Sequence, residues 1–276
     1  MAPYTAAQKK LIAEFIEVTR TKDTVAPKFL KASGWKLEQA IVDYLAAAKS
    51  TQHVYTSPIT ILFESYRDDP VESPDTIGIT RAIDFLRDIN VELDEVACLA
   101  VSEQLKCPSI GEITRDGFVL GWINAGCDTI PLMQEWVKKV RTRIPKDPQL
   151  FRKVYRYAFT VSRMQGQRHL QFDIAVEQWR LFFTAERGGL AWNTKTTPWL
   201  DWWIQYLEDF GSKPVTKDLW EQVEVFMRKT LEDEDMHWYN PDGAWPGALD
   251  DFVGWVQDER HEPKMGKGQE QDMEVE

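Results

Sequence analysis

Apolar residues recur at helical spacing along almost the whole chain, and the first run lies close to the amino terminus. Leu11, Phe15 and Val18 stand at positions i, i+4 and i+7, which places them on one helical face. Thr5 and Gln8 have the spacing of a capping box, in which each side chain binds the other residue's backbone N–H. The pattern therefore predicts a helix that begins next to Thr5.

Two further helices complete a small amino-terminal bundle. One spans about residues 24–32 and is ended by Ser33-Gly34, because glycine readily adopts the left-handed backbone of a helix stop. The next begins after Trp35 and carries an apolar stripe at residues 37, 41, 44, 45 and 48. We expect a three-helix bundle over residues 6–48, whose small core favours a binding module, and a polar linker at 49–58.

Residues 59–257 predict a second, larger all-α domain. Leu150, Val154, Tyr157 and Val161 are typical of its i, i+3/i+4, i+7 runs, and no alternating run of strand length occurs. We expect about ten helices joined by short loops. The polar, acidic residues 258–276 contain no aromatic residue, and their composition predicts a disordered tail.

The acidic charge of the chain is concentrated near its end. Among 276 residues, 33 are Lys or Arg and 44 are Asp or Glu, a net charge of −11. The net charge is +1 up to Lys217 and −12 after it, and nine of the twelve Trp lie between Trp179 and Trp255. This balance argues against nucleic acid, whose phosphates need a basic surface, and favours a basic protein partner.

Neither a secretion signal nor a membrane span is apparent. The segment Met1 to Lys10 has no apolar core, and no later run approaches 18 apolar residues. Cys98, Cys107 and Cys127 are odd in number and form no C-x-x-C pair, which favours buried free thiols over disulfides or zinc. We therefore expect no membrane partner and a cytoplasmic or nuclear location.

Catalytic and cofactor motifs are missing from the sequence. The four histidines form no H-E-x-x-H, and neither G-x-x-x-x-G-K nor G-x-G-x-x-G occurs. A nucleophile at Cys107 or Cys127 has no histidine or other base nearby in the sequence. We expect no catalytic residue, no bound metal and no cofactor.

Two segments resemble eroded calcium loops of the EF-hand type. If Ile79 occupies the eighth loop position in residues 66–79, Glu72 stands at position 1 and Ile83 at position 12, so the bidentate carboxylate is missing. Residues 240–245 keep only a fragment of the pattern. We therefore expect EF-hand-like helix pairs without metal, and keep a calcium-binding protein as an alternative.

The acidic segment itself leaves two interpretations open. Asp218 falls in the first turn of a helix that starts near Thr216, where the helix dipole favours a carboxylate in any case. Asp250 is expected to be exposed beside an apolar helix stripe, and Ala244 is small enough for another backbone to approach. These residues form either a solvated face or a docking patch for Lys and Arg.

The same residues resemble a known family. Three segments are similar to the potentiating-neddylation domain of the defective-in-cullin-neddylation proteins, namely Asp242-Gly243-Ala244-Trp245-Pro246, residues 249–253 and an upstream Lys217-Asp218-x-Trp220. We expect the chain to be a fungal member of this family. Residues 33–37 and Ala40 resemble the ubiquitin-associated-like domain of that family. Further matching pieces lie at 77–79, 126–130, 148–151, 166–167 and 175–179, so the resemblance runs from about Gln8 to Trp255.

The resemblance implies a scaffold-type ligase that has no nucleophile. Such a protein holds a cullin, through its winged-helix carboxy-terminal region, beside the modifier-charged neddylation conjugating enzyme, and accelerates transfer by proximity. It implies cullin contacts at Asp218, Ala244 and Asp250. Ubiquitin or the ubiquitin-like modifier is a candidate partner of residues 6–48, and a plain ubiquitin-binding adaptor is a further alternative function.

A second site implied by the resemblance is an apolar pocket for the acetylated amino-terminal Met of the conjugating enzyme. It is expected at Ile79, Cys98, Val101, Cys107, Ile113, Val161 and Leu181. The chain departs from the animal pattern around this pocket. Gln178 occupies an aromatic position, and Ala82 and Gly111 stand where larger residues are common.

Overall fold

The computed structural model describes residues 4–19, 21, 24–44 and 58–261. The chain divides into two compact units, residues 1–65 and residues 66–276. The described residues are almost entirely helical, which confirms the all-α prediction. The helix α4 (Pro58–Tyr66) spans the boundary between the units, and most of the linker expected at 49–58 lies outside the described residues.

Local signals place the helices of the first unit correctly. The helix α1 (Ala6–Thr19) begins with the capping box, in which the Thr5 backbone N donates to Gln8 Oε1 at 3.0 Å and the Gln8 backbone N donates to Thr5 Oγ1 at 3.2 Å. The helix α2 (Ala26–Ala32) ends before Gly34, whose φ of +60° is left-handed. A third helical stretch covers 37–44, and its expected continuation to 48 lies outside the described residues. The core of this small bundle is formed by Phe15, Ala26, Leu30 and Ala40.

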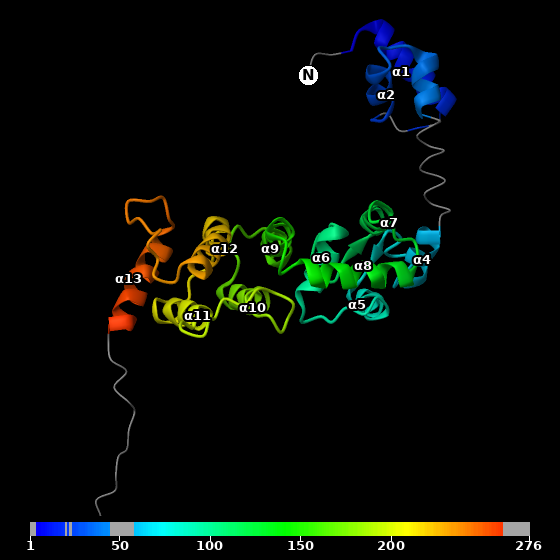
Figure 1. The fold of residues 1–276 in the computed structure, drawn as a ribbon. Coiled ribbons are helices and arrows are strands. Elements are labelled where there is room, and N and C mark those ends of the chain that lie inside the picture. Colours follow the sequence, from blue (N-terminus) through cyan, green and yellow to red (C-terminus); the bar gives the residue numbers. More distant parts are fainter. Residues whose placement is uncertain (1–3, 20, 22–23, 45–57, 262–276) are drawn as a thin grey trace, which may run out of the picture. The chain divides into compact units, whose positions relative to one another are not determined.

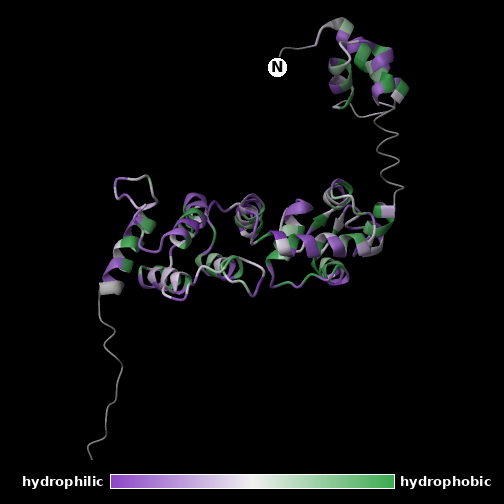
Figure 2. Cartoon of the chain, in the orientation of Figure 1, coloured by the Kyte–Doolittle hydropathy of each residue, from purple (hydrophilic) through white to green (hydrophobic). Residues whose placement is uncertain are grey.

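The second unit is a larger helical assembly (Figure 1). Its helices are α5 (Ile79–Asp88), α6 (Val96–Gln104), α7 (Arg115–Asn124), α8 (Ile130–Arg143), α9 (Pro148–Ser162), α10 (Phe172–Phe182), α11 (Trp199–Asp209), α12 (Lys217–Glu232) and α13 (Gly247–His261). Figure 1 shows α11, α12 and α13 at one end and α5, α7 and α8 at the other. Figure 2 shows hydrophilic and hydrophobic residues mixed along these helices. The helix α13 continues to His261, beyond the expected end at 257.

Two pairs of helix-connecting loops meet through short antiparallel contacts. The strand β1 (Thr76–Ile77), between α4 and α5, pairs with β2 (Ile113–Thr114), between α6 and α7, with Ile77 opposite Ile113. A single bridge between Leu170 and Val215 joins the α9–α10 and α11–α12 loops in the same way. This arrangement repeats the helix–loop–helix pairing of EF-hands. The contacts are too short to leave an alternating pattern, so the sequence showed no strand.

The loop register differs from the one expected. Ile77, and not Ile79, occupies the paired eighth position, because Ile79 already begins α5. Counting from Ile77 puts Pro70 at position 1 and Arg81 at position 12, where calcium would require a carboxylate. Counting from Ile113 puts Lys106 and Gly117 at the same positions of the partner loop. Basic and apolar residues at the ligand positions argue against calcium coordination by this loop pair.

The middle of the second unit is held by α9, which packs against both α6 and α12. The rings of Tyr155 on α9 and Trp220 on α12 stack with centroids 4.3 Å apart. Tyr155 Oη donates to the Trp220 carbonyl at 2.8 Å, and Trp220 Nε1 donates to the Tyr155 carbonyl at 2.9 Å. These reciprocal bonds satisfy buried polar groups on both helices, so they fix the position of α12 along α9.

Among the described residues, no helix combines the length and the apolar character that crossing a bilayer requires.

Candidate functional site

An acidic face lies where α12 and α13 begin, and we define it by Asp218, Ala244 and Asp250. Thr216 caps α12, its Oγ1 accepting a hydrogen bond from the Leu219 backbone N at 3.1 Å, as the predicted helix start requires. Asp218 is exposed in the first turn of α12, and Asp250 stands in the first turn of α13. Both carboxylates are therefore favoured by a helix dipole, which holds whether or not a partner binds.

Asp250 is less free than the sequence suggested. It is half-buried, and Tyr239 Oη donates a hydrogen bond to its Oδ1 at 2.7 Å. Burial and this bond to the carboxylate raise the pKa of Tyr239 to about 12. At neutral pH the phenol of Tyr239 therefore keeps its proton, and it holds the Asp250 carboxylate in one orientation as a hydrogen-bond donor.

Ala244 is exposed in the loop between α12 and α13, and aromatic side chains on the inner side of this loop hold it in place. Trp245 contacts Phe226 of α12 edge-on, with ring centroids 5.9 Å apart, and lies 5.8 Å from Trp238. A Cβ at position 243 would lie 2.8 Å from the Asn240 carbonyl oxygen, so the turn before Ala244 is tight. The methyl group of Ala244 is thus presented on a rigid loop.

A pocket that the sequence reasoning missed lies beside the acidic face. We call it the α11–α13 pocket, and its volume is about 380 Å³. Leu219 and Asp251, the residues that follow Asp218 and Asp250, both line it, which shows that the two helix starts are neighbours. Phe210 lines it too and is 57% exposed. Two sequence features could have indicated this pocket: the aromatic residues 206 and 210, which are four positions apart, and the small residues 247 and 248.

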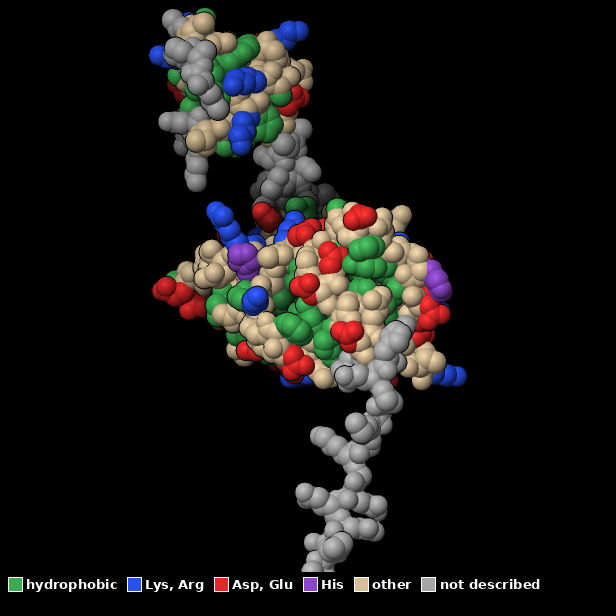
Figure 3. Space-filling view, turned by 90° about the vertical axis from the view of Figure 1, so that its left-hand side faces the viewer, with side chains coloured by type: hydrophobic (Ala, Val, Ile, Leu, Met, Phe, Trp, Pro, Cys, Tyr) green, Lys and Arg blue, Asp and Glu red, His purple; other side chains and the backbone are tan. Residues whose placement is uncertain are grey.

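Figure 3 shows the end of the second unit that carries α11, α12 and α13. Acidic side chains are spread among apolar ones over this face, and basic side chains lie toward its margin. The surface combines negative charge with accessible apolar area, which suits a protein partner with basic and apolar side chains.

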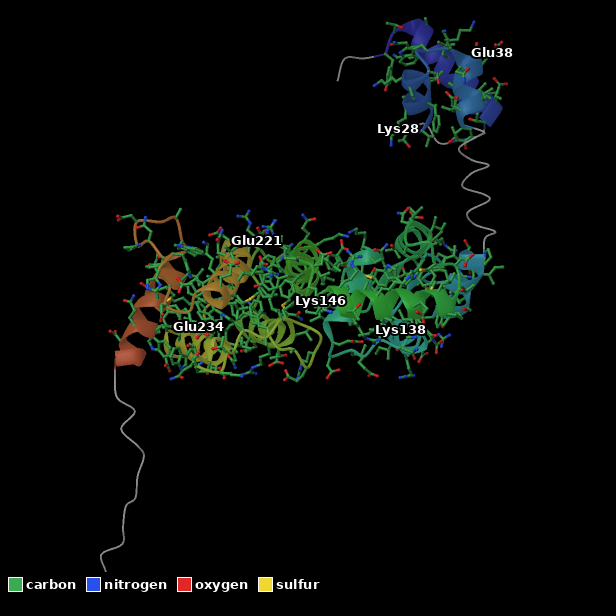
Figure 4. The ribbon with its side chains drawn as sticks, viewed as in Figure 1. Lys28, Glu38, Lys138, Lys146, Glu221 and Glu234 are labelled. Atoms are coloured by element: carbon green, nitrogen blue, oxygen red, sulfur yellow. The ribbon has the colours of Figure 1, made fainter. Side chains whose placement is uncertain are left out.

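Ion pairs with α9 hold α12 in place behind the acidic face. Glu224 is 1% exposed and accepts a hydrogen bond from Arg152 Nε of α9 at 3.0 Å, and it also pairs with Arg228. Glu221, labelled in Figure 4 on α12, pairs with Arg156 of α9 at 3.2 Å. The acidic face therefore stands on a helix whose own buried carboxylate is neutralised by two arginines.

The loop after α12 holds three groups that resemble a small ligand set. Oxygen or nitrogen atoms of Asp233, Asp235 and His237 lie within 4.8 Å of one another. Asp233, however, already accepts hydrogen bonds from the backbone N of Asp235 at 3.1 Å and of His237 at 3.0 Å. This geometry is that of a turn that ends a helix, so we assign the cluster a structural role.

A second candidate site is an apolar pocket between α5 and α6, with a volume of about 190 Å³. We call it the α5–α6 pocket. Three of the seven residues expected at such a pocket line it, namely Ile79, Cys98 and Leu181. The three departures from the animal pattern, Ala82, Gly111 and Gln178, also line it. The other wall residues were not foreseen: Ile83, Leu86, Leu93, Leu99, Ser102 and Ile110.

The other four expected residues lie in the interior and not on the wall of this pocket. Val101, Cys107, Ile113 and Val161 are all nearly inaccessible. The backbone carbonyl of Cys107 accepts a hydrogen bond from Tyr157 Oη at 2.6 Å. Ile113 lies in β2 opposite Ile77. In this structure these four residues are therefore not among those that line the pocket, and their part in binding stays a prediction.

The three cysteines are free thiols, as expected, and none is activated. Burial raises the pKa of Cys98 to about 11 and that of Cys107 to about 12, and it also raises the pKa of Cys127. Cys98 differs from the expectation in being half-buried, because its side chain reaches the pocket. A thiol with such a pKa stays protonated at neutral pH and is a poor nucleophile.

Comparison with known proteins adds evidence on the whole chain. A family model described as cullin binding matches residues 132–255, and a model of a UBA-like domain matches residues 9–50. Over 92% of its length the chain is 35% identical to Defective in cullin neddylation protein 1 of Pyricularia oryzae, covering 95% of that protein. It is 28% identical to the protein of that name from Yarrowia lipolytica over 90% of this chain and 96% of the other. The corresponding protein of Saccharomyces cerevisiae is 25% identical over 92% of this chain and 95% of the other.

Proposed function

The chain belongs to the defective-in-cullin-neddylation protein family, and we propose that it acts as a scaffold that joins a cullin to the neddylation conjugating enzyme. A cullin-binding domain and a role in cullin neddylation follow from the family. The finer mechanism is our proposal, and one observation carries it. A single helical unit bears both an acidic face, at the starts of α12 and α13, and a separate apolar pocket, lined from α5 and α6, and Figure 1 shows these two pairs of helices apart from each other.

We assign the acidic face to the cullin. Asp218 and Asp250 offer two carboxylates, of which Asp250 is held by Tyr239, together with the small side chain of Ala244, and the α11–α13 pocket beside them can take an apolar side chain. Lys and Arg side chains of a basic winged-helix surface would complement these carboxylates. The rigid backing by Trp245 and Tyr239 means that little side-chain entropy is lost on binding.

We assign the α5–α6 pocket to the acetylated amino-terminal Met of the conjugating enzyme. Its volume of about 190 Å³ suits one Met side chain with a small cap, and most of its wall is apolar. Burial of the side chain contributes about 2 kcal/mol. Acetylation removes the ammonium charge, whose transfer into an apolar pocket would oppose binding.

The scaffold needs no nucleophile of its own. Both partners would be held on one unit, so the cullin lysine meets the modifier thioester at a high effective concentration. The high pKa of each cysteine agrees with this mechanism. The free thiols also suit the reducing cytoplasm or nucleus, where we place the activity, and we keep residues 6–48 as a site for ubiquitin or the modifier.

The proposal is tested by modifier transfer onto a carboxy-terminal cullin fragment, with and without the full chain. Asp250→Lys should weaken cullin binding by about 2 kcal/mol or more, roughly a 30-fold change in Kd, because it reverses a fixed charge in the interface. Ala244→Arg should act similarly through a steric clash. Asp116→Lys is the matched control, since Asp116 is exposed in the first turn of α7 at the other end of the unit.

Calorimetry with the folded variants decides the assignment. An affinity of Asp250→Lys equal to that of Asp116→Lys would reject the acidic face as the cullin site. Equal affinities of acetylated and unacetylated conjugating-enzyme peptides for the wild-type chain would reject the assignment of the α5–α6 pocket.

A further inference from the structure

The loop that carries Ala244 is tied to a second loop through a single carboxylate. Glu234, labelled in Figure 4, lies two residues beyond α12, and its Oε2 accepts hydrogen bonds from Thr196 Oγ1 at 2.8 Å and Thr197 Oγ1 at 2.7 Å. The hydroxyl of Thr194 lies 3.1 Å from the same oxygen. We call these four residues, Glu234 and the three threonines, the Glu234 clamp. It joins the α12–α13 loop to the α10–α11 loop.

The threonine side of the clamp is a closed turn that is anchored to α11. The Thr194 backbone N donates to the Thr197 carbonyl at 2.9 Å, and the Thr197 backbone N donates to Thr194 Oγ1 at 3.0 Å. Asn193, the residue before this turn, accepts a hydrogen bond from the Leu200 backbone N at 2.8 Å and donates to Asp201 Oδ2 at 2.9 Å. Thr197 is only 4% exposed. The hydroxyls are therefore held in place at the start of α11.

Contacts also run from Glu234 along its own loop to the acidic face. The carbonyl of the preceding residue accepts a hydrogen bond from Trp238 Nε1 at 3.2 Å. The rings of Trp238 and Trp245 lie 5.8 Å apart, and Tyr239 donates the hydrogen bond to Asp250 that is described above. The clamp therefore stands at the start of the loop that presents one part of the acidic face and orients another.

We propose that Glu234 is a positioning residue of the acidic face, which holds the α12–α13 loop in the conformation that binds the cullin. This inference rests on the function proposed above for the acidic face. Hydrogen bonds from hydroxyl groups to a carboxylate are charge-assisted and stronger than neutral ones. Without them the loop would sample more conformations, and binding would have to order it again. The clamp thus contributes to cullin affinity by preorganisation.

Two substitutions of the same carboxylate separate preorganisation from charge. Glu234→Ala removes both the acceptor and a negative charge, whereas Glu234→Gln removes the charge but keeps an acceptor oxygen for the threonines. In calorimetry with the full chain, Glu234→Ala should bind the carboxy-terminal cullin fragment about three- to tenfold more weakly than the wild type, and Glu234→Gln should stay within about twofold of it. Glu232→Ala is the matched charge control and should also stay within about twofold, because Glu232 is exposed at the end of α12.

Thr197→Val tests the clamp from its other side. Val has nearly the shape of Thr, but its side chain donates no hydrogen bond. This variant should weaken cullin binding about two- to threefold, and it should have no further effect when Glu234→Ala is already present. Both variants should bind the acetylated peptide with wild-type affinity, since the α5–α6 pocket is lined by residues outside the two loops. A general loss of stability would not produce this pattern.

The outcomes separate this inference from the function on which it rests. If Asp250→Lys and Asp116→Lys bind the cullin fragment equally, the acidic face is not the cullin site and both fail. If Asp250→Lys weakens binding but Glu234→Ala binds like Glu232→Ala, the positioning role of Glu234 alone is overturned. The same holds if Glu234→Gln binds as weakly as Glu234→Ala, because charge and not the clamp would then decide. A loss of affinity in Glu234→Ala that Glu234→Gln restores supports both.

Discussion

Replacement of Gly111 by Ala should disturb the α5–α6 pocket more than it disturbs folding. The backbone at Gly111 has a φ of +79°. A Cβ there would lie 2.7 Å from Ile79 Cγ1 and 3.1 Å from Ile79 Cβ. Rotation about χ1 of Ile79 can move its Cγ1 but not its Cβ, so the first residue of α5 must shift. Ile79 is a wall of the pocket, and the shift changes the shape of the site.

The magnitudes follow from these contacts. A left-handed backbone costs Ala about 1–2 kcal/mol, and the smaller conformational freedom of Ala in the unfolded chain offsets about 0.4–1 kcal/mol of this. The net loss of stability is therefore about 1 kcal/mol, and the shift of Ile79 adds little because that side chain is 61% exposed. Loss of about 50 Å² of apolar contact with a bound Met would weaken binding by about 1.3 kcal/mol, roughly tenfold.

Gly166 provides the matched control for backbone strain. Its φ is +80°, and a Cβ there would meet no atom within 4 Å. Urea unfolding followed by tryptophan fluorescence reports mainly on the second unit, because every Trp except Trp35 lies in it. Gly111→Ala and Gly166→Ala should lose similar stability, and calorimetry should show weaker acetyl-peptide binding for Gly111→Ala alone.

Two results would refute this reasoning. Equal peptide affinity of the two variants would mean that Ile79 is not a wall of the binding site. A much larger loss of stability in Gly166→Ala would mean that backbone strain at these positions is not governed by φ alone.

Three further predictions concern other parts of the second unit. Alkylation of Cys98 should be slow at pH 8 and faster toward pH 11, because burial raises the pKa of the thiol to about 11. Because the folded protein holds this proton more tightly than the unfolded chain, the contribution of the neutral thiol to the free energy of unfolding is complete below pH 9 and is lost as the pH rises through 11. Mass spectrometry should show that the acetylated peptide protects Cys98 but not Cys127, which lies outside the pocket; equal protection would contradict the pocket assignment. Ala248→Trp should fill the α11–α13 pocket and weaken cullin binding about tenfold in calorimetry, with unchanged acetyl-peptide affinity. Glu224→Gln should lower the free energy of unfolding by about 1–3 kcal/mol in a denaturant titration, since two partly exposed arginines lose their buried counter-charge; an unchanged midpoint would show that these pairs contribute nothing.

Features with a local physical cause could be predicted from the sequence. The capping box at Thr5 and Gln8 and the cap at Thr216 each involve groups three residues apart, so their spacing alone places the helix starts. The left-handed stop at Gly34 is local in the same sense. Asp218 could also be located, because it stands at the predicted helix start near Thr216, whereas Ala244 and Asp250 were joined to it by the family resemblance.

The walls of the α5–α6 pocket could not be predicted for a physical reason. The helix α6 is surrounded on most sides, so Val96, Leu99 and Val101 are all buried, and its apolar residues do not mark one inner face. Cys98 reaches the pocket while Val101, one turn later, belongs to the core. Periodicity cannot separate these roles, because both kinds of residue are apolar, and only tertiary packing decides which side chain meets the cavity.

The register of the paired loops shows the same limit at longer range. Ile77 and Ile113 are brought together by two separate helix–loop–helix units, and nothing within either loop specifies the partner residue. Gly111, in the loop before β2, then packs against Ile79 at the start of α5. The loop pairing therefore helps to shape the pocket. Its wall depends on contacts between residues more than 30 positions apart, beyond the reach of local sequence patterns.

Rigidity between the two surfaces is what a scaffold of this kind requires. Proximity accelerates a reaction only if the bound partners are held in a narrow range of orientations, because free rotation would restore the lost entropy. The helix α9 contacts α6, which lines one site, and α12, which bears the other. Its Tyr155–Trp220 stack and reciprocal hydrogen bonds join the two halves through buried groups. In the proposed scaffold, this aromatic packing would keep the distance between the acidic face and the α5–α6 pocket constant.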